Sequence, residues 1–145
     1  MVTAMSENLL ENARRMHRSG NFAEAVRLYA EVLRLDPRQF EALYALVYLR
    51  FQAGQYGDAE RLMRQAVEIN PRMAEAHFIQ GCCLHRLNRI EDALTAFDRA
   101  VANKPVFVEA LINRGAALMA LNRHNEALKD FRTCLLYTSP SPRDS

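Results

Sequence analysis

The stretches LRLDP (33–37), VEINP (67–71) and VANKP (101–105) each end in a proline, and one constant interval separates Pro37 from Pro71 and Pro71 from Pro105. The residues before each proline are apolar at helical spacing, which is typical of an amphipathic helix. Proline cannot continue a helix and disfavours helical geometry in the residue before it. We therefore expect a helix to end at each of these points, and the chain between them to be a repeated unit.

Other residue types recur at the same interval. An alanine recurs at one position in all four blocks. Another position holds glycine twice and asparagine twice, and both residue types tolerate the left-handed conformation that often ends a helix. A third column is large and apolar: Tyr29, Met63, Phe97 and Phe131. The remaining structural repeat positions are Ala25, Ala59, Ala93 and Ala127; Gly20, Gly54, Asn88 and Asn122; and Pro37, Pro71 and Pro105.

These columns divide each block into two helices, A and B. The Gly/Asn column ends helix A, and the proline ends helix B. The alanine near the start of helix B allows two helices to approach closely, and the large residue four positions later lies on the same face. The predicted helices are 6–19, 22–35, 39–52, 56–69, 73–86, 90–103, 107–120 and 124–137.

The pattern resembles the tetratricopeptide repeat (TPR) family, whose repeat of about 34 residues carries small, aromatic, alanine and proline positions. The resemblance covers Ser6 to about Leu136, with Ala13, Gly81 and Gly115 at the small position of helix A and Val47 departing from it. It implies an all-α fold, a right-handed superhelical α-solenoid of antiparallel helix pairs whose A helices line a concave groove. The predicted organisation is a lead at 1–5, repeats at 6–39, 40–73, 74–107 and 108–133 (the last truncated), and a tail at 134–145.

In TPR proteins, fixed positions of helix A usually face the groove. Here they form an apolar and aromatic stripe, edged by the acids Glu7, Glu41, Glu75 and Glu109. Acids in a first helical turn also complement the helix macrodipole, and we favour that interpretation of the acidic row. The groove candidates are Leu10, Arg14, His17, Tyr44, Tyr48, Phe51, Phe78, Cys82, His85, Ile112, Asn113 and Met119. An exposed stripe of this kind is typical of an interaction surface.

Two binding modes of the family can be checked by residue type. TPR domains that hold chaperone C-termini place several Lys, Arg and Asn side chains in the groove to bind a carboxylate. The matching positions here are mostly apolar or acidic, so we reject this mode. The asparagine ladder of O-linked N-acetylglucosamine transferases requires Asn in many consecutive repeats, and here Asn113 alone matches.

Composition narrows the function further. A formal net charge of +2 and the lack of a Lys/Arg run argue against nucleic acid as a partner. No basic-flanked leader is visible, and no apolar stretch approaches the length of a membrane span. The cysteines Cys82, Cys83 and Cys134 lack the spacing of a disulfide scaffold, so we expect reduced thiols and a cytoplasmic location.

No catalytic or metal-binding chemistry is expected for the chain as given. His77, Cys82, Cys83 and His85 are close in sequence, but on one helix they point in different directions and cannot converge on a tetrahedral ion. Phosphate-loop and nucleophile-elbow motifs are also lacking. We therefore predict no cofactor, no metal and no enzymatic activity for these residues.

The stretch CLLYTSPSPRDS (134–145) does not continue the repeat, because Pro140 is one residue later than the register requires. A DNA string that encodes Cys134–Asp144 resembles a transposase-style adapter used in sequencing libraries. We therefore expect residues 134–145 to be non-native and the natural sequence to diverge after Thr133. The alternative is a disordered SPSP tail with proline-directed phosphorylation sites.

Three functional hypotheses follow. The first is a protein–protein interaction scaffold that binds a peptide or helix of a partner in the groove. The second is the N-terminal arm of a larger enzyme, such as a glycosyltransferase of the O-linked N-acetylglucosamine type or a sulfotransferase. The third is a self-associating solenoid, since an uncapped terminal repeat exposes apolar surface.

Overall fold

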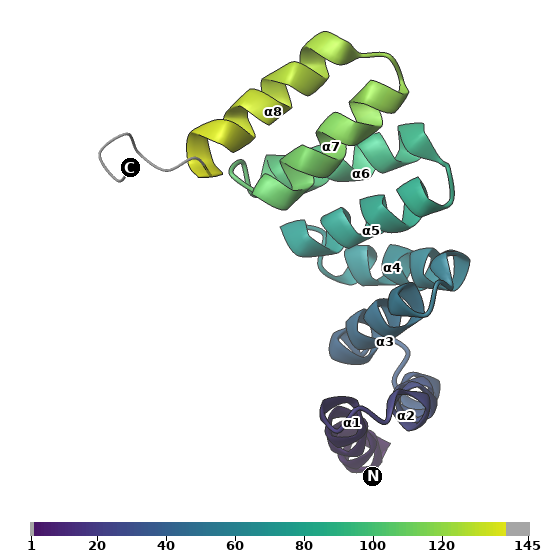
Figure 1. Ribbon diagram of the computed structural model, residues 1–145. Coiled ribbons are helices and arrows are strands. Elements are labelled where there is room, and N and C mark those ends of the chain that lie inside the picture. Colours follow the sequence, from purple (N-terminus) through teal and green to yellow (C-terminus); the bar gives the residue numbers. More distant parts are fainter. Residues whose placement is uncertain (1, 139–145) are drawn as a thin grey trace. The chain divides into compact units, whose positions relative to one another are not determined.

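The computed structural model describes residues 2–138, which form eight α-helices and no strand. They run α1 (Val2–Arg18), α2 (Phe22–Leu35), α3 (Phe40–Gln52), α4 (Tyr56–Ile69), α5 (Ala74–Arg86), α6 (Ile90–Asn103), α7 (Val108–Ala120) and α8 (His124–Thr138). The prediction of an all-α fold built from helix pairs is confirmed for this part of the chain (Figure 1). The expected helix bounds hold within one residue except at the start of the chain.

The first helix begins at Val2 rather than Ser6, so most of the predicted lead segment is helical. Nothing in residues 2–5 stops a helix, because they include neither proline nor glycine. At the other end, residues 134–138 of the predicted tail continue α8, and 139–145 lie outside the described residues.

The Gly/Asn column ends every A helix in the same way. Gly20, Gly54, Asn88 and Asn122 all have positive φ, between 60° and 84°. After α5, the Asn88 N–H donates to the His85 carbonyl at 2.9 Å and the Arg89 N–H donates to the Leu84 carbonyl at 2.9 Å. This pair of bonds is the Schellman motif, which satisfies the last carbonyls of a helix and turns the chain into helix B.

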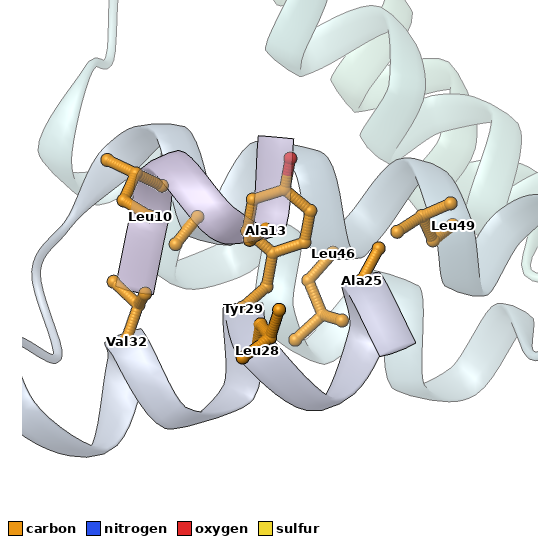
Figure 2. Close-up of a cluster of buried hydrophobic side chains, with 9 residues drawn as sticks. Leu10, Ala13, Ala25, Leu28, Tyr29, Val32, Leu46 and Leu49 are labelled. Carbon is orange, nitrogen blue, oxygen red and sulfur yellow. The ribbon is translucent and has the colours of Figure 1, made fainter. Parts of the chain in front are cut away.

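The described residues fall into two compact units, which meet in the chain at Pro71 and Arg72. Unit 1 contains α1–α4, and its main core forms where α2 packs between α1 and α3. Figure 2 shows Leu10 and Ala13 of α1 together with Leu28, Tyr29 and Val32 of α2 in this core. Burial of such side chains contributes roughly 1.5–3 kcal/mol for each large one.

Unit 2 contains α5–α8 and repeats this arrangement with its own clusters. Phe97 of α6 is fully buried among Leu84, Ala93 and Ala117. The four repeated alanines, Ala25, Ala59, Ala93 and Ala127, are all fully buried, as expected for close helix contacts.

Candidate binding surface

Arg14 of α1 forms ion pairs with two acids of unit 1. Its Nε and Nη2 donate to the two carboxylate oxygens of Glu41 on α3, at 2.5 and 2.6 Å, and its Nη1 donates to Glu11 at 2.9 Å. These hydrogen bonds lower the pKa of Glu41 below its ordinary value. A bidentate pair of this kind links α1 to α3, and it leaves Arg14 engaged with acids of its own chain.

Two tyrosines follow Glu41 along α3. Tyr44 is half-buried and stacks on Phe40, with ring centroids 5.7 Å apart. Tyr48, one turn further on, is 47% exposed. A tyrosine presents a flat apolar ring with a polar tip, which suits it to contacts with a partner. We name Arg14, Tyr44 and Tyr48 the unit 1 face.

In unit 1, the groove candidates His17 and Phe51 lie near the ends of α1 and α3 and pack at the corner with the next helix. The His17 ring packs edge-on against Phe22 and against Tyr29, and its Nδ1 lies 3.4 Å from the Tyr29 hydroxyl. Phe51 packs against Tyr56 at 5.1 Å. Both were predicted to line the groove, but these contacts lie within their own repeats, and both side chains are half-buried.

Leu10 was predicted to line the groove, but it is buried in the core of unit 1. Its side chain is 5% exposed and belongs to the core cluster that includes Val32 of α2 (Figure 2). The helical position gives the direction of a side chain but not what covers it. Leu10 is therefore a packing residue.

In unit 2, the three groove candidates of α5 are all half-buried. Phe78 is half-buried and packs against Phe97 at 6.1 Å and Phe107 at 5.0 Å. Cys82 is half-buried, and burial raises the pKa of its thiol to about 11. His85 is half-buried near the end of the helix. Phe78 and Cys82 also pack against the core cluster around Phe97.

The α7 candidates remain accessible. Ile112 is 48% exposed and Met119 is 44% exposed, and their spacing of seven residues, about two helical turns, places them on one side of the helix. Met119 Sδ lies 3.2 Å from His124 Nδ1. Asn113 is half-buried, and its amide donates to the Glu109 carbonyl at 2.7 Å. We name Ile112, Asn113 and Met119 the unit 2 face.

Sequence reasoning missed an ionic cluster in unit 2. Arg114 of α7 donates to both carboxylate oxygens of Asp130, at 2.8 and 2.7 Å, and to Asp98 at 3.2 Å. Asp130 is 4% exposed. These residues line a pocket of about 240 Å³. The signal was present: the other repeats place Leu28, Leu62 and Ala96 at the position of Asp130, so a buried acid there required a partner.

Within residues 2–138, His, Cys, Asp and Glu side chains do not gather in threes as a metal site would require. No helix in the same range combines the length and the apolar character needed to cross a bilayer.

Comparison with known proteins gives a family and a fold. The sequence model of the tetratricopeptide repeat family matches residues 10–71, 44–105 and 84–135. A search of curated proteins finds no match. Among solved structures, a MamA protein is 24% identical with a TM-score of 0.86, covering 90% of this chain and 71% of MamA. MamA from Desulfovibrio magneticus is 22% identical with a TM-score of 0.85, covering 94% and 78%.

A third similarity involves an enzyme. The O-GlcNAc transferase of Thermobaculum terrenum is 30% identical with a TM-score of 0.68. The match covers 81% of this chain but 23% of the transferase. The two MamA structures are 24% and 22% identical to this chain, and at this level the similarity shows a shared fold alone.

Proposed function

The chain belongs to the tetratricopeptide repeat family, and from that premise we propose that the A helices present a peptide-binding face to a partner protein. Protein interaction is the role of such repeats, because stacked helix pairs make extended surfaces rather than catalytic cavities. The observation that carries the proposal is the exposure of large apolar side chains on the A helices: Tyr48 on α3, and Ile112 and Met119 on α7.

The partner segment is apolar rather than carboxylate-ended. Arg14 is the cation on the unit 1 face, and its guanidinium is already shared between Glu41 and Glu11. A terminal carboxylate would have to displace two acids held by charge-assisted hydrogen bonds. Aromatic and thioether side chains instead favour an amphipathic helix or extended segment with apolar anchors.

Photo-cross-linking tests this assignment. A benzophenone amino acid placed at Tyr48, Ile112 or Met119 should cross-link to one shared partner in extracts of the source cells. The same probe at Thr95, an exposed residue of α6, is the matched control. Cross-links that are equally frequent from Thr95, or absent from all three face positions, would contradict the proposal.

A second candidate is the substrate-recruiting arm of a larger enzyme. It is favoured by the 30% identity to the repeats of an O-GlcNAc transferase. Against it, Asn113, the one residue that fits an asparagine ladder, bonds its own helix through Glu109. An independent genomic read beyond Thr133 tests this candidate, together with the adapter hypothesis for 134–145. A catalytic domain in that read would favour the arm.

A further inference from the structure

Unit 1 contains a pocket of about 590 Å³ that shares no residue with the unit 1 face. Its apolar wall is made by Phe22 and Val26 of α2 and by Leu49 and Ala53 at the end of α3. Phe22 is 50% exposed, so about half of its side chain is available to a guest. The volume lies in the range of sites that hold a small ligand or a few side chains of a partner.

Arg50 gives this pocket a defined polarity. Its side chain is part of the lining, and its Nη1 donates to the amide oxygen of Gln55 at 2.7 Å. Gln55 is neutral, and among residues 2–138 no carboxylate forms a salt bridge with Arg50. A guanidinium carries five N–H donors in a rigid fork that matches a carboxylate. The charge beside the apolar wall is therefore open to an acidic group from outside.

The repeat fold alone does not explain this combination. Two repeats later, in unit 2, Leu118 stands at the position of Arg50 and Arg123 at that of Gln55. Leu118 is 4% exposed and packs in a core cluster with Leu94, and Arg123 is paired with Glu126 at 2.5 Å. The equivalent place in unit 2 is a smaller pocket of about 440 Å³, and its lining includes Glu91 and Arg123. Its arginine is held in an internal ion pair, and an acid already lies in its wall. An arginine bonded to a neutral amide beside an open apolar wall is a property of unit 1.

We propose that this pocket binds a segment of a partner protein that carries a bulky apolar side chain and, within one helical turn of it, an aspartate or glutamate. The apolar side chain lies against Phe22, Val26 and Leu49. The carboxylate accepts hydrogen bonds from Arg50. Burial of the anchor drives binding, and the charge-assisted bond selects acidic over neutral segments.

Two displayed peptide libraries test the proposal on the full chain. Both have random flanks around a large apolar residue, and they differ in a fixed Glu or Gln three or four positions away. Enriched peptides are then measured by fluorescence anisotropy in their Glu and Gln forms. We expect the Glu form to bind about tenfold more tightly, which corresponds to about 1.4 kcal/mol.

The variants Arg50→Gln and Phe22→Ala locate the site. Arg50→Gln should remove the preference for Glu, and Phe22→Ala should weaken both forms. The matched controls are Arg38→Gln, an exposed arginine outside the pocket, and Ile90→Ala, which stands at the position of Phe22 in unit 2. Both controls should bind as the wild type does. The proposal is overturned if the wild type enriches no peptides beyond those that Phe22→Ala enriches. It is also overturned if Arg50→Gln still prefers the Glu form.

Further measurements distinguish a partner peptide from other occupants of the pocket, and the pocket from the unit 1 face. Circular dichroism first establishes that each variant is folded. Tyr48→Ser should retain the selected peptides, and their loss would place them on the unit 1 face instead. Laurate binding more tightly than every selected peptide would assign the pocket to lipid. A dimer in sedimentation that Phe22→Ala dissociates would assign it to a second copy of the chain. Either result overturns the proposal.

Discussion

Phe97 of α6 occupies the space that a side chain on Gly81 of α5 would fill. A Cβ atom built on Gly81 would lie 2.4 Å from Cε1 of the Phe97 ring. The same relationship recurs one repeat later, where a Cβ on Gly115 would lie 2.5 Å from Cε1 of Phe131. Contacts this short cannot exist, so glycine is required opposite each phenyl ring.

Gly81→Ala should therefore destabilise unit 2. The added methyl group must push the buried Phe97 ring out of its place, and overpacking of this kind costs about 1–3 kcal/mol. Urea unfolding followed by circular dichroism measures the loss. Gly57→Ala is the control, because outside the local backbone of α4 no atom lies within 4 Å of a Cβ at Gly57. Equal midpoints for Gly81→Ala and the wild type would contradict this packing.

The same residue pair shows what sequence could and could not predict. Local signals determined the helix bounds, because glycine, asparagine and proline each act on the backbone where they stand. The size of the A-helix residue depends on the side chain that it faces on helix B. At the same spacing along the chain as Gly81 and Phe97, Ala13 is paired with Tyr29 and Val47 with Met63. Val47 and Met63 are both fully buried, so the larger A-helix residue accompanies a slimmer partner.

The candidate surface was harder to predict because exposure depends on neighbouring helices. Leu10 and Ile112 share one repeat position, yet Leu10 is 5% exposed and Ile112 is 48% exposed. Repeat register specifies the direction of both side chains equally well. What covers each of them is decided by side chains from other helices. The pocket beside Arg50 was missed for the same reason, whereas Asp130 does stand out in the sequence, at a position that is apolar in the other repeats.

Asn122 should tolerate glycine but not alanine. Its φ of 60° is a left-handed conformation that costs an ordinary L-residue roughly 1–2 kcal/mol. Asn122→Ala is expected to lower the free energy of unfolding by about 1 kcal/mol, whereas Asn122→Gly should leave it unchanged or raise it. Thermal unfolding of the two variants side by side measures the difference. The prediction fails if alanine proves as stable as glycine.

The Arg114–Asp130 pair should be sensitive to the loss of one partner. Asp130→Ala leaves a guanidinium that is 22% exposed without its bidentate acceptor, at a cost of about 3 kcal/mol. Replacing both residues together, in Arg114→Leu with Asp130→Leu, should recover more than half of that loss, because no charge is then stranded. Denaturant unfolding gives both values.

The control for this pair is Asp98→Asn. Asp98 also bonds Arg114, but its side chain is 58% exposed, so the change should cost less than about 1 kcal/mol. If Asp98→Asn were as damaging as Asp130→Ala, burial would not be the cause of the effect.

Glu41 should make unit 1 less stable in acid. The hydrogen bonds from Arg14 lower the pKa of Glu41 in the folded chain, so the folded state binds its proton less readily than the unfolded state does. The stabilisation is complete above the ordinary glutamate pKa of about 4.3 and is lost as the pH falls through the lower folded pKa. Because the side chain is 46% exposed, the contribution is at most about 1 kcal/mol.

Urea midpoints at pH 7 and pH 3 measure this effect in the wild type and in Glu41→Gln. The variant should be less stable at pH 7, and the two proteins should converge at pH 3, where the wild-type carboxylate is protonated. Glu109→Gln is the matched control, since Glu109 holds the same repeat position in unit 2 and its side chain is exposed. A difference between wild type and Glu41→Gln that persists unchanged at pH 3 would show that the bond to Arg14 is not what stabilises the chain.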